Sequence, residues 1–337
     1  MGMQWDGQSV AAGDDGVLPG LERIGLVRSV RVPQFAGITF HEVLCKSALN
    51  KVSAAADLPF RFTVNPYRGC SHACRYCFAR PTHEYLDLGP GADFDRELVV
   101  KTNVAEVLRR ELFRRSWTRE TVALGTNTDP YQRAEGRYRL MPASLAALAD
   151  SGTPFSILTK GTLLRRDLPL IAQSGVATGV SVSLAVLDPD LHRSVEPGTP
   201  TPAARLELIG DIAAAGLDCH VMVAPVLPYL TDSDEHLAAL LGAIAAAGAS
   251  GVTVFALHLR GATRGWFLSW LASAHPALLP RYRELYGRGG YVAQGYRDEL
   301  RRKVMPLIRG LGLRTRPDTP RIAPATPVAG AMQHALF

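Results

Sequence analysis

The sequence predicts an α/β fold built from parallel strand–helix units. Between residues 59 and 275, six short apolar segments rich in β-branched residues alternate with segments of helical periodicity, and polar or glycine-rich junctions separate them. Strands that alternate with helices in this way are typical of parallel βαβ units. The predicted strands are Phe62 to Val64, Val122 to Gly125, Phe155 to Thr159, Gly179 to Leu184, Asp218 to Ala224 and Gly251 to Leu257. The predicted helices are Val104 to Arg115, Ala143 to Asp150, Arg166 to Ser174, Pro202 to Ala215, Ser233 to Ala247 and Gly265 to Ala274.

Length and composition are those of a soluble globular protein. The chain has 337 residues, of which 47% are hydrophobic and 20% are charged, so one large domain with extensions can bury a substantial core. No apolar run is long enough to cross a bilayer, and the first residues lack a charged-then-apolar leader. We therefore expect a cytoplasmic protein with no membrane partner.

Residues 1–58, before the first unit, are predicted to form an extension without clean strand–helix alternation. The first twenty residues are turn-rich and are expected to be mobile. Ile38 to Lys51 has a more ordered pattern and is expected to pack near the functional site. Farther along, the connection from Pro81 to Asn103 is predicted to be a surface excursion, with Asn103 capping the helix that follows.

Three of the five cysteines, Cys70, Cys74 and Cys77, fall within eight positions at the spacing C-x3-C-x2-C. Three thiolates on one short loop can hold three irons of a [4Fe-4S] cluster and leave the fourth iron open. Zinc prefers four closed ligands and would have only the single histidine inside the loop as a fourth. A disulfide is disfavoured for three cysteines crowded into one loop. Cys45 and Cys219 lie far from the loop in the sequence and are expected to be buried free thiols.

The stretch around these cysteines resembles a known family. Tyr76 precedes the last cysteine, and the flanking sequences are Asn65-Pro66-Tyr67-Arg68-Gly69-Cys70 and Cys77-Phe78-Ala79-Arg80. The spacing is similar to the signature of the radical S-adenosylmethionine (SAM) enzymes, and the flanks resemble the spore-photoproduct-lyase-like branch. The resemblance implies a partial (β/α)6 TIM-like barrel of the radical SAM type over residues 59–275, with N-terminal and C-terminal extensions.

The resemblance also implies the cofactors. In this superfamily the open iron of a [4Fe-4S] cluster binds SAM, and one electron from the cluster cleaves SAM to a 5′-deoxyadenosyl radical. Cys70, Cys74 and Cys77 would then be the cluster ligands, and Tyr76 and Phe78 would shape the pocket beside the cofactor. An electron donor such as a flavodoxin or ferredoxin would be a partner. A cluster with an open iron needs reducing conditions, which suits the expected compartment.

In such a barrel the functional residues are expected where strands end, at the C-terminal face. The second predicted strand leads into Asn127-Thr128-Asp129-Pro130, where many radical SAM enzymes carry Gly-Gly-Glu-Pro. A carboxylate followed by proline offers an acceptor on a stiffened turn. The resemblance therefore implies that Asp129, with Thr128 beside it, meets the amino group of SAM. An ordinary Asx turn would explain the same residues.

Lys160, one of only five lysines, follows the third strand. Its ammonium can bind a carboxylate as a point charge, and in spore-lyase-like relatives the lysine at this place contacts the SAM carboxylate. A salt bridge to Asp167 or Asp188 is the alternative. On the fourth strand, alternation puts Ser181 and Ser183 on one face. Ser183 is nearer the mouth and is predicted to bond to SAM, with a satisfied core serine as the alternative.

Three further residues are predicted near the cofactor. Glu196, in a Glu-Pro pair, and Arg205 on the next helix are similar to the pattern of this branch. They are predicted either to pair with each other or to meet the ribose and carboxylate of SAM. The small Ala224, at the end of the fifth strand, permits an adenine face to approach, although core packing explains it as well. A histidine at the end of the sixth strand, His258, is interpreted as structural.

Positive charge gathers toward the C-terminus. Residues 260–321 carry thirteen lysines and arginines against four acids, so with a total net charge of +6 the rest of the chain is acidic by three. The predicted basic segment, residues 276–337, favours a nucleic-acid partner whose bases stack on its interleaved tyrosines, Tyr282, Tyr286, Tyr291 and Tyr296. A solvated arginine-rich surface is the alternative. One helix is predicted from Arg297 to Leu311, and the last fifteen residues are expected to be disordered.

The sequence therefore predicts a radical SAM enzyme that abstracts hydrogen from an unidentified substrate. Spore photoproduct lyase, which reverses a thymine photoproduct in DNA, uses a cysteine near the end of the second strand as hydrogen donor. The stretch Gly125-Thr126-Asn127-Thr128 contains none, so DNA photoproduct repair is kept as an alternative. A second alternative is a non-enzymatic, metal-stabilised nucleic-acid-binding protein, which would hold zinc in a closed site.

Overall fold

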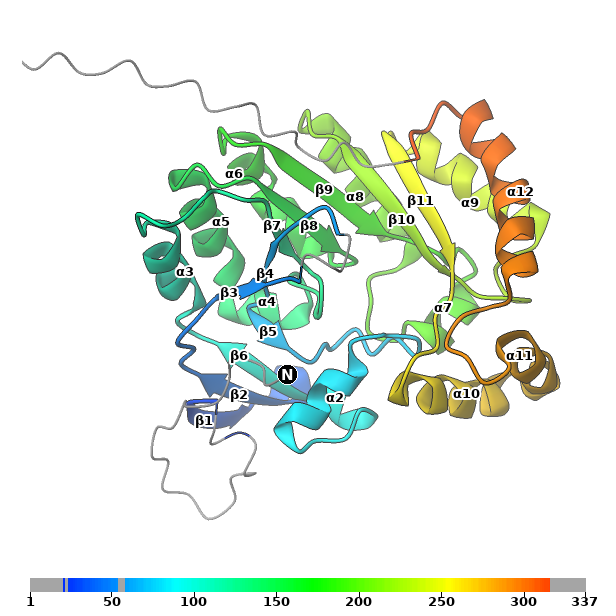
Figure 1. The fold of residues 1–337 in the computed structure, drawn as a ribbon, viewed down its shortest axis with the longest axis horizontal. Coiled ribbons are helices and arrows are strands. Elements are labelled where there is room, and N and C mark those ends of the chain that lie inside the picture. Colours follow the sequence, from blue (N-terminus) through cyan, green and yellow to red (C-terminus); the bar gives the residue numbers. More distant parts are fainter. Residues whose placement is uncertain (1–20, 22–23, 54–57, 316–337) are drawn as a thin grey trace, which may run out of the picture.

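The computed structural model describes residues 21, 24–53 and 58–315, so the first twenty and last fifteen residues, for which mobility or disorder is predicted, lie outside it. The larger of its two sheets has seven strands in the order β11-β10-β9-β8-β7-β4-β3 (Figure 1). Six of them are parallel, and each pairs with the next along the chain. They are β4 (Phe62–Val64), β7 (Val122–Leu124), β8 (Phe155–Thr159), β9 (Thr178–Ser183), β10 (Cys219–Val226) and β11 (Gly251–Ala256). The seventh, β3 (Leu49–Lys51), pairs antiparallel with β4.

The six predicted strands are confirmed, and their ends differ from the predicted ones by at most two residues. This open, parallel arrangement is the predicted partial barrel. Helices follow the strands and cover the outer face of the sheet (Figure 1). They are α3 (Val104–Leu112), α5 (Leu140–Asp150), α6 (Leu168–Ala172), α8 (Pro202–Ala214), α9 (Asp234–Ala246) and α10 (Ala262–Ala274). Shorter pieces lie in the connections: α4 (Arg133–Tyr138), η4 (Thr162–Asp167) and α7 (Pro189–Val195).

Local chemistry explains why these segments form where they do. The side chain of Thr201 accepts a hydrogen bond from the Ala204 N–H at the start of α8, and Pro202 occupies the first turn. Ser233 caps α9 in the same way. Apolar residues alternate along the strands, and the outward ones, such as Val182 and Val221, are fully buried under these helices.

A second sheet lies beside the first and was not predicted. Its order is β1-β2-β6-β5, formed by β1 (Leu26–Arg31), β2 (Thr39–Val43), β6 (Glu97–Lys101) and β5 (Tyr67–Arg68). A short helix, η1 (Pro33–Phe35), joins β1 to β2. The part of the predicted extension that the structure describes therefore supplies strands to both sheets.

The prediction of a surface excursion from Pro81 to Asn103 is wrong. This connection contains η3 (Arg80–Leu86), α2 (Ala92–Arg96) and β6, whose central residues 98–100 are at most 2% exposed. Asn103 precedes α3 but makes no capping hydrogen bond with its side chain. Its amide instead bonds to both backbone groups of Cys45, at 2.8 Å and 3.0 Å, and so fastens the N-terminal region to the barrel.

The fifth parallel strand is longer than predicted. Its prolines were expected to end it at Ala224, but β10 continues through Pro225 to Val226. The pairing register with β11 shifts between Val223 and Val226. Because proline lacks the N–H that a regular ladder needs, it is tolerated at such an irregularity.

The C-terminal segment packs against the open edge of the sheet. It comprises η5 (Pro276–Leu278), α11 (Leu279–Tyr286) and α12 (Gln294–Gly310), and α12 lies against α9 and β11. Three of the four tyrosines expected to stack bases are engaged internally. Their hydroxyl groups donate to Pro228 O, Leu257 O and Asp232 Oδ2, from Tyr282, Tyr286 and Tyr296 respectively. Tyr282 and Tyr286 are also buried, so neither offers a ring face to a partner.

Two further expectations can be checked in the described residues. Cys45 and Cys219 are buried free thiols, as predicted. No helix in the described part of the chain has the length and apolar character needed to cross a membrane.

Candidate active site

The cysteine loop begins at a glycine that no other residue can replace without strain. The chain leaves the larger sheet at Val64 and pairs briefly with β6 through β5 before it reaches the loop. Gly69 then turns the backbone with φ of 80°. A Cβ there would lie 2.8 Å from the Leu98 side chain and 2.9 Å from that of His83. This turn aims Cys70 and the following residues toward the ends of the parallel strands.

Hydrogen bonds clamp the loop on two sides. On one side, Gly69 O accepts from Thr128 Oγ1 at 2.7 Å and from Gln132 Nε2 at 3.1 Å, and the Ser71 N–H donates to Gln132 Oε1 at 2.8 Å. On the other side, the Gly198 N–H donates to the backbone carbonyl of residue 72 at 3.1 Å. The loop is therefore fixed between the turn after β7 and the segment after α7.

The three thiols are free and mostly enclosed, with Cys70 and Cys74 buried and Cys77 half-buried. Burial raises the pKa of all three thiols, and Asp129 raises that of Cys70 further. The positive charge of Lys160 partly offsets this effect and lowers the pKa of Cys74 and Cys77. Without a metal these thiols are protonated, whereas coordination to iron would deprotonate them.

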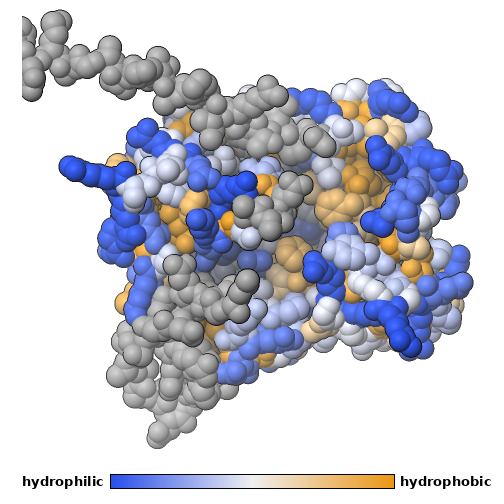
Figure 2. Space-filling view, viewed as in Figure 1, coloured by the Kyte–Doolittle hydropathy of each residue, from blue (hydrophilic) through white to orange (hydrophobic). Residues whose placement is uncertain are grey.

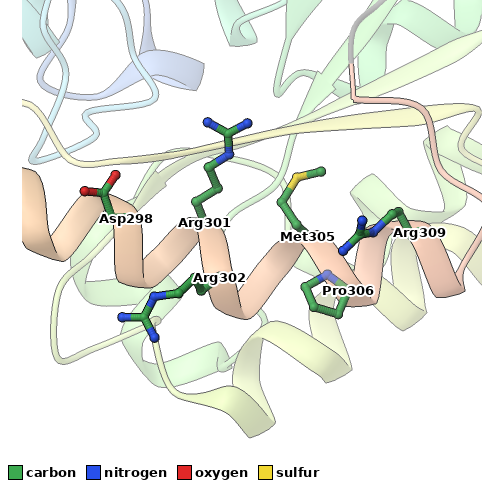
Figure 3. A pocket seen from close by; sticks show the side chains of 6 residues that line it. All are labelled: Asp298, Arg301, Arg302, Met305, Pro306 and Arg309. Atoms are coloured by element: carbon green, nitrogen blue, oxygen red, sulfur yellow. The ribbon is translucent and has the colours of Figure 1, made fainter.

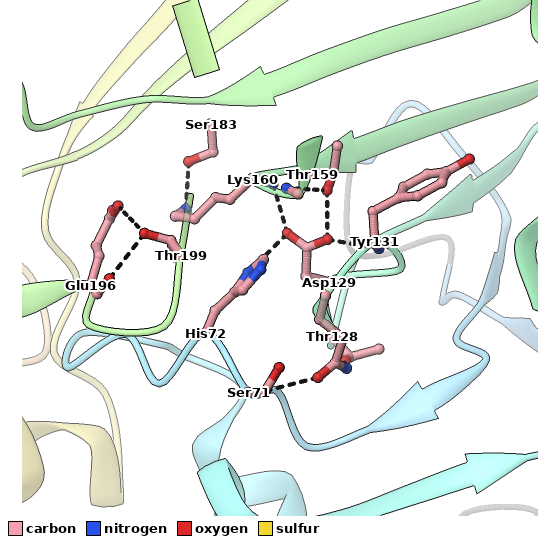
Figure 4. Close-up of polar contacts among 12 residues, drawn as sticks. Ser71, His72, Thr128, Asp129, Tyr131, Thr159, Lys160, Ser183, Glu196 and Thr199 are labelled. Atoms are coloured by element: carbon pink, nitrogen blue, oxygen red, sulfur yellow. Dashed lines mark hydrogen bonds and ion pairs between the residues drawn. The ribbon is translucent and has the colours of Figure 1, made fainter. Parts of the chain in front are cut away.

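Asp129 is the centre of the polar contacts at the strand ends (Figure 4). Its Oδ1 accepts from Thr159 Oγ1 at 2.5 Å and from the Tyr131 N–H at 2.9 Å. Its Oδ2 accepts from the Lys160 N–H at 2.6 Å and lies 3.3 Å from His72 Nδ1. The bond to Tyr131 is the Asx turn considered above. Burial alone would raise the pKa of Asp129, but His72 and these hydrogen bonds hold it below its usual value.

Lys160 reaches from the end of β8 to the end of β9. Its Nζ donates to Ser183 Oγ at 2.6 Å and lies 5.7 Å from the centroid of the Tyr76 ring. The two salt bridges considered as alternatives are replaced by other contacts. Asp167 pairs with the arginine that precedes it, and Asp188 caps α7. The lysine ammonium therefore contacts a neutral hydroxyl and an aromatic face, and its charge acts on Glu196 and on two of the three cysteines.

Glu196 and Arg205 pair with each other next to Tyr76 and Ser183. Arg205 Nη2 lies 2.6 Å from Glu196 Oε2, and both side chains are 0% exposed. The Tyr76 hydroxyl donates to Glu196 Oε1, and Arg205 Nη1 donates to Ser183 O at 3.0 Å. Burial would raise the pKa of Glu196, but Arg205 and Lys160 lower it to about 2. The ion pair thus links the cysteine loop to the end of β9, and contact of either side chain with SAM stays a prediction.

The remaining predicted residues differ in their surroundings. Thr128 is buried against Gly69, whereas Phe78 is 67% exposed on the surface beside the loop. Ala224 is half-buried, and its carbonyl lies 3.5 Å from Ser183 Oγ. The structure therefore brings the loop together with residues from the ends of β7, β8, β9 and β10.

Sequence analysis missed three polar residues that organise the site. His72 was considered only as a fourth zinc ligand, yet it faces Asp129. Thr159, directly before Lys160, donates to the same carboxylate, and Gln132 bridges the loop to the turn after β7. All three are polar residues inside or next to the motifs, which is the signal that would have found them.

Comparison with known proteins identifies the family. Residues 64–241, more than half of the chain, match the model of the radical SAM superfamily. The chain belongs to this superfamily. It is 74% identical over 312 residues to an uncharacterized protein of Mycobacterium tuberculosis (strain H37Rv), covering 91% of this chain and 92% of the relative. It is 24% identical over 173 residues to an uncharacterized protein of Methanocaldococcus jannaschii, covering 51% of this chain and 62% of that protein.

The structural neighbours of this radical SAM protein are spore photoproduct lyases. A variant of that enzyme with bound AdoMet and dinucleoside spore photoproduct has a TM-score of 0.63 and 14% identity, covering 90% of this chain and 86% of the other. Another variant of spore photoproduct lyase has a TM-score of 0.61 and 16% identity, and the match covers 81% of this chain and 80% of the other. At these identities the likeness is one of fold.

The residues present fit the cofactors that the superfamily implies. Three free thiols share one loop and influence one another electrostatically, but no three His, Cys, Asp or Glu side chains of the described residues converge closely enough for a single metal ion. A four-iron cluster is larger than one ion, so thiols spaced in this way are compatible with it. Ser71 Oγ and Arg75 Nε on the same loop are buried without a hydrogen-bond partner among the described residues, as expected if they meet a bound group.

Proposed function

We propose that this protein is an enzyme that uses a [4Fe-4S] cluster and SAM to abstract hydrogen from a substrate. The observation that supports the proposal most strongly is the clamped loop of Cys70, Cys74 and Cys77 beside Asp129 and Lys160 at the strand ends. When bound and reduced, the cluster supplies one electron that cleaves SAM to methionine and a 5′-deoxyadenosyl radical, which takes a hydrogen atom from the substrate.

Lys160 is proposed to bind the carboxylate of SAM. Its ammonium is a compact charge that, among the described residues, donates a hydrogen bond to the neutral Ser183 Oγ and acts electrostatically on two of the three cysteines. Ser183 orients this ammonium and offers its own hydroxyl. A carboxylate that accepts a hydrogen bond from one of the other two N–H groups of this ammonium would lie directly beside the thiol loop.

Asp129, with Thr128, is proposed to receive the amino group of SAM. A carboxylate offers about four lone-pair positions, and Asp129 has four neighbours. The contact with His72, at 3.3 Å, is the longest of these, so it is the one that an ammonium group displaces most easily. Thr128 contributes by fixing the turn against Gly69 rather than by contacting SAM with its engaged hydroxyl.

We propose that a buried hydrogen-bonded group holds the cofactor-binding residues in place. It consists of Tyr76, Glu196 and Arg205. Their hydrogen bonds tie the residue before Cys77 to the backbone of Ser183, so the loop and the strand end keep a fixed separation. Ala224 leaves room at the end of β10 for a planar group. An external one-electron donor such as a flavodoxin or ferredoxin is required, and the exposed Phe78 marks the side of the loop that such a partner can reach.

The decisive test is anaerobic reconstitution of the full chain with iron and sulfide, followed by dithionite and SAM, with assay of 5′-deoxyadenosine. We expect cluster-dependent 5′-deoxyadenosine, lost in Cys70→Ala and retained in Cys219→Ala, a matched control because Cys219 is a buried thiol in the core. Tightly bound zinc without SAM cleavage would contradict the proposal. It would favour the non-enzymatic, metal-stabilised alternative.

DNA photoproduct repair is a second candidate, supported by the fold shared with spore photoproduct lyase. Its weakness is chemical, because the turn after β7 carries Thr126 and Asn127 where a cysteine donor is expected, and both contact Asn65 Oδ1. Ultraviolet-irradiated thymine-containing DNA is therefore the first substrate to add to the assay. Restoration of thymines would establish this activity, and SAM cleavage without restoration would exclude it.

A further inference from the structure

Three aromatic rings lie in contact at the open edge of the larger sheet; two are stacked, and the third is tilted by 60° against its neighbour. Phe255 comes from β11, His258 from the residues directly after it, and Tyr291 from the segment before α12. The centroids of Phe255 and His258 are 5.7 Å apart with nearly parallel planes, and those of His258 and Tyr291 are 4.7 Å apart. Phe255 is 40% exposed and Tyr291 is 45% exposed, so two exposed rings lie together at this edge. We call these three residues the ring stack.

The ring stack begins on the face of the sheet that carries the candidate active site. In the parallel register, Ser183 pairs with Met222, and Met222 pairs with Thr253, so the three side chains share one face. Phe255 lies two residues beyond Thr253 and therefore points to the same face. Ser183 is the residue that binds Lys160. The rings thus lie at the β11 edge of the sheet, on the face that also carries Ser183.

Positive charge surrounds the rings. A groove of about 450 Å³ between β11 and α12 is lined by the ring stack, by Arg297 and Arg301, and by no aspartate or glutamate of the described residues. The Arg260 guanidinium lies 5.7 Å from the centroid of the Tyr291 ring. Burial lowers the pKa of His258, and Arg260 and Arg297 lower it further, so the middle ring is neutral near pH 7.

The side of α12 that lines the groove carries both arginine and apolar side chains. Arg301 and Met305 rise from one side of α12, opposite to Arg302 (Figure 3). Both also line the groove against β11. On the side of the molecule where α12 lies, hydrophobic surface is flanked by hydrophilic side chains (Figure 2). The groove therefore combines exposed apolar rings with arginines at their margin.

We propose that the ring stack and its arginines bind a single-stranded nucleic-acid segment and hold it at the entrance to the candidate active site. Unpaired bases stack on exposed aromatic faces, and guanidinium groups neutralise the phosphates between them. An acidic peptide would satisfy the arginines but would leave the exposed rings uncovered. The role of the bound nucleic-acid segment as a substrate rests on the proposed function, whereas its binding needs neither the cluster nor SAM.

The test measures binding to the full chain as purified, before any reconstitution. A short labelled oligo(dT) is compared, by fluorescence anisotropy, with an abasic oligonucleotide of the same length. We expect oligo(dT) to bind about tenfold more tightly, because each stacked base contributes appreciably to binding. Phe255→Ala and Tyr291→Ala should each remove most of this difference, and Phe255→Trp should keep it.

Charge and ring effects can be separated with two further variants. Arg297→Gln should weaken both oligonucleotides and reduce the slope of log affinity against log salt by about 0.7, as for one lost phosphate contact on a single strand. Phe113→Ala is the matched control, because Phe113, directly after α3, is also exposed (55%) and has the Arg109 guanidinium 4.9 Å from the centroid of its ring. It should leave both affinities unchanged.

Equal affinity for oligo(dT) and the abasic strand would overturn the inference, as would competition by polyglutamate as effective as that of oligo(dT) at equal charge. The outcomes are independent of the proposed function. Oligonucleotide binding without 5′-deoxyadenosine formation would refute the radical chemistry and leave this site standing. SAM cleavage without base-dependent oligonucleotide binding would refute this binding site and leave the radical chemistry standing.

Discussion

The backbone N–H of Lys160 donates a 2.6 Å hydrogen bond to Asp129 Oδ2, so the acid after β7 and the lysine after β8 are held as one unit. The Lys160 side chain then leaves this fixed backbone and reaches Ser183 after β9. Three neighbouring strand ends are therefore joined through one carboxylate and one ammonium. Because the two groups have opposite charge, the unit can hold the two charged ends of an amino acid at a defined separation.

Replacing Asp129 should weaken SAM binding without removing the cluster. In Asp129→Asn the size of the side chain is kept, but the negative charge proposed to accept a charge-assisted hydrogen bond from the amino group of SAM is lost. Loss of such a bond is worth about 1.5–3 kcal/mol, so the dissociation constant of SAM should rise by about tenfold or more. Calorimetric titration of the reconstituted variant, with iron content measured in parallel, checks this. Wild-type affinity with wild-type iron would show that Asp129 serves the fold alone.

Lys160 should be needed for its charge rather than for its packing. Lys160→Met keeps the length of the side chain and removes the ammonium, so SAM affinity should fall by about tenfold or more, the loss expected for one charged hydrogen bond. Ser183→Ala, which removes only the neutral partner, should have a smaller effect. Lys303→Met is the matched control, because Lys303 lies on α12 and pairs with Asp234. A Lys160→Met enzyme that binds SAM normally would contradict the assigned role.

Sequence analysis located this site through features that are local in the chain. The three cysteines lie within eight positions. Lys160 directly follows an apolar strand, Asp129 lies in the turn after another, and Ser183 lies near the end of a third. Their convergence follows from the parallel order of the strands. Whether Glu196 paired with Arg205 or met SAM was not decidable, because both alternatives need the same two residues and only their positions in space separate them.

The buried pair of Glu196 and Arg205 should be important for stability. Glu196→Gln leaves the Arg205 guanidinium fully buried beside a neutral partner, which costs about 3–5 kcal/mol when a buried ion pair is broken. The double variant Glu196→Gln/Arg205→Met, which leaves no unpaired charge, should recover part of this loss. Urea unfolding of the chain without metal measures both. A single variant as stable as the wild type would indicate that the pair is dispensable.

The parts of the fold that sequence analysis missed depend on pairing between distant segments. Strand β2 pairs with β6, so that Thr39 faces Glu97, and β5 has only two residues. The partners of these strands lie far away in the chain, so the local sequence pattern does not reveal the pairing. The prediction that the C-terminal tyrosines form a stacking surface was wrong for two of them for a related reason. Composition suggested a stacking surface of four tyrosines, but Tyr282 and Tyr286 are turned into the core, whereas Tyr291 is exposed together with Phe255 of β11.

His83 should make the stability of the chain sensitive to acid. The side chain is fully buried behind the cysteine loop, with Nε2 2.8 Å from Glu97 O and Nδ1 without a hydrogen-bond partner among the described residues. Burial lowers its pKa from 6.5 to about 4. The folded state therefore binds fewer protons than the unfolded state between these values. The contribution of His83 is fully present above pH 6.5 and is lost as the pH falls toward 4.

His83→Gln separates this effect from the titration of other groups. Glutamine can still donate to Glu97 O but does not ionise, so the difference in unfolding free energy between variant and wild type should change with pH. Relative to the variant, the wild type should lose up to about 3 kcal/mol between pH 6.5 and pH 4. Urea unfolding at a series of pH values measures the difference. A constant difference across this range would mean that His83 is protonated in the folded protein, and the unpartnered Nδ1 would then have to face a group outside the described residues.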